Sequence, residues 1–275
     1  HLLVKFLPIV NFIGKIDAHL SMSKIYTQPP SRLHNYTFSI FLKGSKNYLK
    51  ILDFWHPLIS PAQIVTNSIR LSQRKNKTVL ITGPNAGGKS TVIKSIILAA
   101  YLSQTLTLSP CRQVKLSPFD IMESYFNVPD ITGYKSMFEA ELYRSKNYLD
   151  TLRRSPDLKS LIVLDEIFNS TSPIEGISCS HAIIKRLNQS PNNFSLVTTH
   201  YHYLTTLDDC RTISNYHVKA TKDDEFFHFP YKIYKGPSEQ NIALELLKVK
   251  NFDSHIITDA IAMKEKLTLL KKGIL

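Results

Sequence analysis

The chain has 275 residues, of which 43% are hydrophobic and 20% charged, which excludes a disordered chain and leaves room for one large domain or one domain plus part of a second. Its 34 lysines and arginines outnumber its 22 acidic residues, and the formal net charge of +12 favours a polyanionic partner, nucleic acid before an anionic membrane, over a lysine-rich surface that binds nothing. The widely separated Cys111, Cys179 and Cys210 exclude a disulfide framework or zinc site and predict an intracellular reducing compartment, cytoplasm or nucleus.

The N-terminal stretch predicts a helix from residue 1 to about Ser23, ended by the turn residues Gln28-Pro29-Pro30-Ser31. Its apolar opening is short, is interrupted by Lys5, Pro8 and Lys15, and lacks a secretory cleavage pattern. We therefore expect neither a signal peptide nor a transmembrane segment. Because the chain begins with His1, we interpret this helix as the end of a longer one in a larger protein.

Three short strands are predicted next, at Tyr36–Leu42, Tyr48–Leu52 and Ile64–Leu71, separated by turn residues such as Gly44. They indicate a small sheet that leads into the main domain. The run Arg74-Lys75-Asn76-Lys77 then reads as a solvated turn.

The sequence TVLITGPNAGGKST, residues 78–91, contains the pattern G-x-x-x-x-G-K-[ST] between an apolar strand and a helix that begins at Lys89 or Ser90. This pattern is typical of a loop whose backbone N–H groups surround phosphate oxygens, with the helix N-terminus directed at the same phosphates. Lys89 is expected to reach the β- and γ-phosphates, and the Ser90 hydroxyl to ligate Mg²⁺. The sequence therefore predicts a nucleoside triphosphate site.

After this loop, strands and helices alternate, which predicts an α/β domain with a mainly parallel sheet flanked by helices and a ligand at the carboxyl ends of the strands. The expected strands are Gln113–Leu116, Ile121–Val128, Leu161–Leu164, Phe194–Thr199 and a hairpin strand at Phe226–Tyr234. The expected helices are Val92–Gln104, Ser136–Leu152, His181–Leu187, Ile242–Lys248 and His255–Leu270, with a polar loop at Asn127–Lys135.

Two adjacent acids, Asp165 and Glu166, end the buried strand at 161–164. Behind a phosphate loop, Asp165 is expected to hold Mg²⁺ and Glu166 to orient or deprotonate the attacking water, which favours hydrolysis over binding alone. His200 follows the next buried strand and suits either a contact to the γ-phosphate or a surface position. The pair His200 and His202 lacks the partners of a metal site.

These motifs resemble those of the C-terminal ATPase domain of the MutS DNA mismatch-repair family, a branch of the ABC-type ATPases. The loop from Thr82 to Thr91 is similar to the family's TGPNMGGKST, and Asp130–Glu141 resembles its S-T-F-M-x-E signature. The match spans roughly residues 50–265. The resemblance implies residues 1–35 as the end of an upstream lever domain, 36–265 as the ATPase domain and 266–275 as a tail.

The resemblance also implies a site for ATP and Mg²⁺. Catalysis would involve Glu166 as general base, Lys89, and His200 as γ-phosphate sensor, with Ser90 and Asp165 on the metal. Each site would be completed by a second MutS-like subunit, whose nucleotide Ser136 would contact, and ATP would close the dimer as a clamp on DNA. The implied nucleotide-binding residues are Gly83, Pro84, Asn85, Ala86, Gly87, Gly88, Lys89, Ser90, Thr91, Ser136 and, at the adenine, Ile64.

Phe168-Asn169-Ser170 departs from the family's D-E-I-G-R-G-T, and Ile64 stands where an aromatic residue is expected. The first departure bears on dimer geometry and turnover, and it motivates the alternative of a nucleotide-binding switch with little hydrolysis. Another ABC-type ATPase is the third reading, but the chain has no LSGGQ-like signature. Most DNA contact in the family comes from upstream domains; the candidate basic residues here are Lys43, Lys46, Arg70, Arg74 and Lys75.

Overall fold

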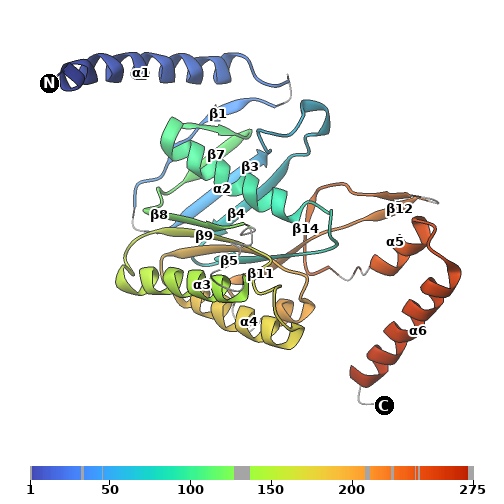
Figure 1. Ribbon diagram of the computed structural model, residues 1–275. Helices are drawn as coiled ribbons and strands as arrows, with labels where there is room; N and C mark the ends of the chain where they lie inside the picture. The colour runs from blue at the N-terminus through green and yellow to red at the C-terminus, as the bar shows by residue number, and fades with distance from the viewer. Residues whose placement is uncertain are drawn as a thin grey trace.

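The computed structural model describes residues 2–31, 34–44, 46–126, 137–207, 211–223, 226–238, 240 and 242–271, with the backbone alone at 2–5, 268, 270 and 271. A six-stranded sheet lies at its centre. Helix α2 (Lys89–Leu106) and a four-stranded sheet cover one face, and helices α3 (Met137–Arg154) and α4 (Pro173–Gln189) cover the other (Figure 1). This arrangement confirms the α/β class and the sheet flanked by helices.

The central sheet has the order β14-β11-β5-β10-β9-β8 and is parallel except where β14 runs antiparallel to β11. All residues of β5, β9 and β10 are buried, as their apolar runs predict for strands covered on both faces. Strand β11 could not be expected from the sequence because Ser214, Asn215 and His217 interrupt its apolar pattern. The strands are β5 (Thr78–Thr82), β8 (Ile121–Tyr125), β9 (Ser160–Asp165), β10 (Asn193–Thr198), β11 (Ile213–Val218) and β14 (Ile233–Lys235).

Alternating residues of the central strands enter two separate cores. Val79 and Ile81 pack with α2 and the inner face of the four-stranded sheet, whereas Leu80 packs with residues of α3 and α4. Both cores therefore fix the carboxyl end of β5, where the phosphate loop begins. Burial of β5 on both faces therefore fixes where the phosphate loop starts.

The four-stranded sheet has the order β2-β7-β3-β4. Its inward residues, including Leu49, Leu71 and Leu116, are fully buried, and Lys50, Arg70 and Lys115 alternate with them on the outer face. A separate pair, β1 (Tyr36–Phe38) and β6 (Leu108–Pro110), lies beside it. The four strands are β2 (Ile40–Phe41), β3 (Tyr48–Phe54), β4 (Asn67–Ser72) and β7 (Gln113–Leu116).

Three expected strands are wrong in extent. The strand at 36–42 is divided into β1 and β2, because Ser39 donates its N–H to the Thr107 carbonyl (2.8 Å) before the chain crosses to the other sheet. The strand at 64–71 begins only at Asn67, since Pro61–Gln63 forms a 3₁₀ turn that Ile64 ends.

The hairpin strand expected at 226–234 is also wrong. It is interrupted at Pro230, which has no N–H to donate to a ladder. On one side of the interruption, β13 (Phe226–His228) pairs with β12 (Thr221–Asp223), and on the other, β14 pairs with β11.

The helices agree better with the sequence. Helix α2 begins at Lys89 as predicted, α3 covers the expected helix from Met137 onward, and α4 starts eight residues earlier than predicted, at Pro173. Ser136, residues 127–135 of the expected polar loop and Val128 of the expected strand lie outside the described residues.

Three further helices lie at the ends of the chain, α1 (Leu2–Thr27), α5 (Ala243–Val249) and α6 (Ser254–Lys271). Helices α1 and α6 extend away from the central body (Figure 1). Both expose apolar side chains, among them Phe12 and Met263. In the part of the chain that the structure describes, no helix is both long and apolar enough to cross a bilayer. Helix α6 continues through residue 265, and the divisions at 35 and 265 stay predictions.

Candidate nucleotide site

The phosphate loop connects β5 to α2 and has the backbone conformation that its glycines allow. Gly83 has φ of +133°, and a Cβ on it would lie 2.3 Å from the Val218 carbonyl oxygen of the neighbouring strand. Gly88, with φ of +90°, precedes the helix. Only a residue without a side chain fits at Gly83, so the loop is folded tightly against β11.

Lys89 folds back over this loop. Its side chain is 4% exposed, and its Nζ donates to the carbonyl oxygens of Gly83 (3.0 Å) and Pro84 (3.3 Å) and to Oδ1 of Asn85 (3.3 Å). The ammonium group therefore lies at the mouth of the loop, where phosphate oxygens can replace the carbonyl oxygens as its partners.

Asp165 and Ser90 meet beside the loop. Ser90 donates its hydroxyl to Asp165 Oδ1 (2.9 Å), and Thr198 donates to the same oxygen (2.5 Å). Parallel register explains this, because Thr198 lies opposite both Asp165 on β9 and Ile81 on β5. A carboxylate beside a hydroxyl is the hard-oxygen donor set that suits Mg²⁺, so the residues present fit that ion.

Glu166 takes a strained turn directly after β9. Its φ is +50°, and its N–H is held by the Thr198 carbonyl (3.1 Å) and hydroxyl (3.0 Å). Its Oε1 lies 3.4 Å from Lys89 Nζ and 3.3 Å from His200 Nδ1, and its Oε2 accepts from Asn169 Nδ2 (3.2 Å). The surrounding backbone thus fixes the direction in which this carboxylate points.

The electrostatic surroundings of Glu166 keep it ionised. The hydrogen bond with His200 is the main cause that lowers the pKa of the Glu166 carboxyl, and the charge of Lys89 lowers it further, against the opposing effect of burial. A carboxylate that is ionised at neutral pH can accept a proton from water.

A pocket of about 300 Å³ brings these groups together, since it is lined by Asn85, Ala86, Gly88–Thr91, Glu166 and Tyr231. Of the expected residues, Asn85, Ala86, Gly88–Thr91 and Glu166 surround one space, whereas Gly83, Pro84 and His200 line a third, larger pocket. Gly87 and Asp165 do not line the pocket of about 300 Å³. Tyr231 was not expected there.

A second pocket, of about 540 Å³, adjoins the first through Gly88, Thr91 and Tyr231. Ile64, which the family resemblance assigned to the adenine, lines it together with His56 and the stacked rings of Phe229 and Tyr231 (centroids 6.3 Å apart). The Tyr231 ring also packs against the loop, because a Cβ on Gly88 would lie 3.0 Å from its Cδ1. This pocket has the flat aromatic walls that suit a nucleobase.

Asn67 holds the aromatic segment in place. Its side chain donates to the Tyr231 carbonyl (2.9 Å) and accepts from the Ile233 N–H (2.9 Å). Sequence analysis missed Phe229 and Tyr231 because it assigned them to a continuous strand. Pro230 between two aromatic residues was the available signal.

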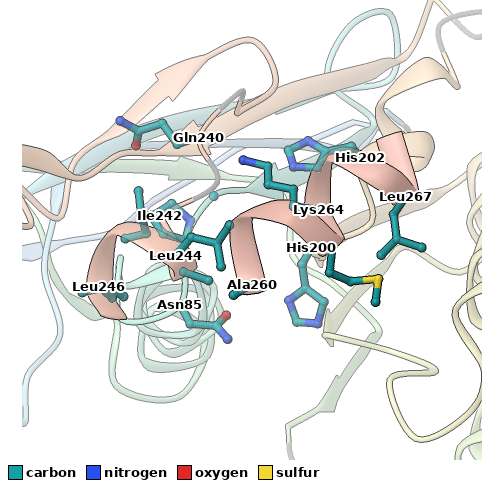
Figure 2. A pocket seen from close by; sticks show the side chains of 14 residues that line it. Asn85, His200, His202, Gln240, Ile242, Leu244, Leu246, Ala260, Lys264 and Leu267 are labelled. Atoms are coloured by element: carbon teal, nitrogen blue, oxygen red, sulfur yellow. The ribbon is translucent and has the colours of Figure 1, made fainter. Parts of the chain in front are cut away.

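A third and larger pocket, of about 910 Å³, opens beyond the phosphate loop. Asn85, His200 and His202 lie on one side of it, and apolar residues of α5 and α6, such as Leu244 and Leu267, lie on the other (Figure 2). His200 therefore lies between this groove and Glu166. The described residues contain no group of three or more His, Cys, Asp or Glu side chains that could hold a metal ion.

Comparison with known proteins gives one consistent result. The family model described as MutS domain V matches residues 79–268. The chain is 28% identical over 258 residues to the DNA mismatch repair protein MutS of Clostridium tetani, which covers 91% of this chain and 28% of that protein. It is also 28% identical over 276 residues to the DNA mismatch repair protein MSH3 of Meyerozyma guilliermondii, covering 95% and 28% respectively. The chain thus spans less than a third of the length of these relatives.

Proposed function

The chain belongs to the MutS family, whose domain V it contains, and we propose that it binds ATP with Mg²⁺ and hydrolyses the γ-phosphate to drive a clamp on DNA. Domain V is the ATPase domain of this family. The observation that carries the proposal is the ionised Glu166 carboxylate, which lines the same pocket as the phosphate loop. Nucleotide binding alone does not require such a base.

The tasks of the proposed reaction are divided among these residues. The backbone of residues 83–90 and the Lys89 ammonium bind the phosphates, and the aromatic pocket at Ile64, Phe229 and Tyr231 binds the base. Ser90 and Asp165 would hold Mg²⁺, which neutralises charge on the phosphates when bound. Glu166 takes a proton from the attacking water, and His200 orients Glu166 and contacts the γ-phosphate.

The Lys89–Glu166 contact of 3.4 Å supports a rearrangement on ATP binding. The same Nζ cannot keep Glu166, two loop carbonyls and Asn85 as partners while it binds phosphate oxygens. Glu166 is then freed from its cation and becomes a stronger base.

ATP turnover by Glu166→Gln tests the proposal, with Glu123→Gln as the matched control because Glu123 is an exposed acid on β8. Release of phosphate should fall by at least about a hundredfold in the first variant and stay unchanged in the second. Nucleotide affinity should persist in both. Turnover that survives in Glu166→Gln would refute the assignment of the base.

The switch alternative is favoured by one observation, since both oxygens of Glu166 already have donors from Lys89, His200 and Asn169. In that case the chain binds ATP tightly but turns it over no faster than the Glu166→Gln variant. The same assay therefore separates hydrolysis from a structural switch.

A second MutS-like subunit is part of the proposed site. The 910 Å³ groove beside Asn85 and His200 is open and has apolar walls on α5 and α6, which supports a protein surface covering the γ-phosphate end (Figure 2). Ser136 is assigned to the partner's nucleotide from the family motif. Turnover per subunit should rise with protein concentration, and a rate independent of concentration would contradict a composite site.

Duplex DNA is the proposed polyanionic partner of the outer face of the four-stranded sheet. Lys50 lies directly opposite both Arg70 on β4 and Lys115 on β7, so three cations stand side by side. Asp53, at the end of β3, is already paired with Arg112 (2.6 Å). Facing like charges repel, and a phosphate backbone would relieve that repulsion. Arg70 was among the residues expected from sequence, and Lys50 and Lys115 were not.

A salt titration of binding to a duplex oligonucleotide tests this surface. Neutralising Lys50, Arg70 and Lys115 to glutamine should lower the slope of log affinity against log salt by about 3. The control neutralises three exposed cations on α3 and α4, Lys146, Lys185 and Arg186. Equal slopes in the two triple variants would show that the row makes no phosphate contacts.

A further inference from the structure

We propose that Glu141, on α3, is a positioning residue that holds the loop from Glu166 to Ser170 in the conformation that catalysis requires. This inference rests on the proposed hydrolysis, and it concerns a residue outside the nucleotide pocket. Helix α3 directly follows the segment that contains Ser136, so Glu141 links that part of the chain to the catalytic loop.

Glu141 contacts the loop with both carboxylate oxygens. Its Oε1 accepts the Phe168 N–H (3.1 Å), and its Oε2 accepts the Ser170 hydroxyl (2.6 Å). Its side chain is only 2% exposed. A buried carboxylate that bridges two points of a loop restricts that loop more than either hydrogen bond alone.

The loop needs such restraint because its backbone is strained. Phe168 has φ of +60° and Glu166 has φ of +50°, a region that residues with a side chain rarely adopt. Strain of this kind persists only where the surroundings determine the conformation. At Phe168 they do so twice, through Glu141 at the N–H and through the Tyr201 hydroxyl, which donates to the carbonyl (3.1 Å).

The same loop also contacts the two residues proposed to act at the γ-phosphate, Glu166 and His200. Tyr201 follows His200, whose Nδ1 lies 3.3 Å from Glu166 Oε1. Asn169, between the two residues that Glu141 holds, donates to Glu166 Oε2 (3.2 Å). Losing the Glu141 contacts would therefore release both the backbone and one side-chain partner of the base.

Glu141 forms no ion pair with Lys, Arg or His among the described residues. Burying a charge without a counter-ion is costly, so stability alone does not account for a carboxylate here. The contribution of Glu141 to the loop is two acceptor oxygens, Oε1 and Oε2, held in fixed positions. A glutamine can reproduce this arrangement, since its oxygen can accept from Phe168 and its amide can donate to the Ser170 oxygen.

Three variants of the 275-residue chain test the role. Glu141→Ala should lower kcat at least about tenfold while the affinity for ATP changes less than about twofold. Glu141→Gln should restore most of kcat. Asn193→Ala is the control for general destabilisation, because Asn193 is 1% exposed and makes three side-chain hydrogen bonds at the opposite end of β10.

Amide hydrogen exchange of the segment 165–171 gives a readout that does not depend on turnover. Exchange there should accelerate in Glu141→Ala but not in Asn193→Ala or Glu141→Gln. If the parent chain turns over ATP no faster than Glu166→Gln does, the proposed hydrolysis with Glu166 as base fails, whereas exchange still reports on the restraint. The positioning role is overturned if Glu141→Ala has no more effect than Asn193→Ala on exchange, or on kcat where the parent chain turns over ATP.

Discussion

Phe168 combines two opposing effects that substitution can separate. Its ring is completely buried in the core formed with α3 and α4 and lies edge-on to Phe138, with the two ring centroids 5.9 Å apart. Its backbone, however, has φ of +60°. Removing the ring with Phe168→Ala should lower the free energy of unfolding by about 3–5 kcal/mol, as is typical of a buried phenylalanine.

Phe168→Gly should be less destabilising than Phe168→Ala. An alanine keeps the penalty of a left-handed backbone, about 1–2 kcal/mol, which glycine does not incur. Glycine costs about 0.5–1 kcal/mol through the greater freedom of the unfolded chain. The difference between these two ranges makes Phe168→Gly the more stable variant by up to about 1.5 kcal/mol, the reverse of the usual order.

Urea unfolding followed by circular dichroism measures this order directly. Ile184 provides the matched control, because it is fully buried in the same core but lies in the middle of α4. There the glycine variant should be less stable than the alanine variant by about 1 kcal/mol. If Phe168→Gly were also less stable than Phe168→Ala, the backbone strain assigned to this loop would be wrong.

Three further predictions concern binding of the nucleobase, binding of the metal ion and the pKa of a buried lysine. Tyr231→Ala should weaken ATP binding by about 1–3 kcal/mol while Tyr231→Phe leaves it unchanged, as measured with a fluorescent ATP analogue; equal affinities in the two variants would contradict base stacking. Asp165→Asn should abolish the loss of ATP affinity that EDTA causes in the parent chain, and an EDTA effect of the same size would exclude Asp165 as a metal ligand. Burial lowers the pKa of Lys77 below the usual 10.5, so the folded chain releases this proton at a lower pH than the unfolded chain does. The stability of the parent chain relative to Lys77→Met should therefore increase as pH rises towards 10.5, and a constant difference would refute this.

The positions of the residues in the proposed phosphate site could be predicted from sequence because local chain direction determines them. Asp165 is the last residue of β9, and Lys89 and Ser90 open the helix that follows β5. Parallel strands bring their carboxyl ends to one edge of the sheet. Glu166 follows for the same reason. Once the strands are recognised, the geometry of a parallel sheet predicts that these side chains lie close together.

The pocket proposed for the nucleobase could not be predicted in the same way. Tyr231 reaches it because β14 pairs with β11, a strand whose polar residues concealed it, and because Asn67 holds the segment from far away in the sequence. Glu141 stands at the end of the segment that resembles the family signature, but its burial against the loop could not be predicted, since nothing local distinguishes a buried glutamate on an amphipathic helix from an exposed one. Long-range pairing and burial set both positions.

At Phe168-Asn169-Ser170, where the chain departs from the family motif, the loop conformation is fixed by side-chain contacts instead of by glycine. The family motif has glycine where this chain has Phe168, and glycine adopts a positive φ at no steric cost. Here the same kind of conformation is imposed on a phenylalanine by a buried ring, by Glu141 and by Tyr201. Gly176 permits the last of these contacts, because a Cβ on it would lie 2.5 Å from the Phe168 carbonyl oxygen and 2.6 Å from the Tyr201 hydroxyl.

A loop held by contacts from other elements responds to movement of those elements, whereas a glycine turn is free to keep its conformation when they move. Helix α3 and the segment after β10 supply the contacts, and they also carry Glu141 and His200. Substitutions of Glu141 and Phe168 to alanine should therefore be non-additive in kcat, because each removes a restraint on the same turn. A double variant whose loss of kcat equals the product of the two single losses would show that Glu166 is positioned independently of α3.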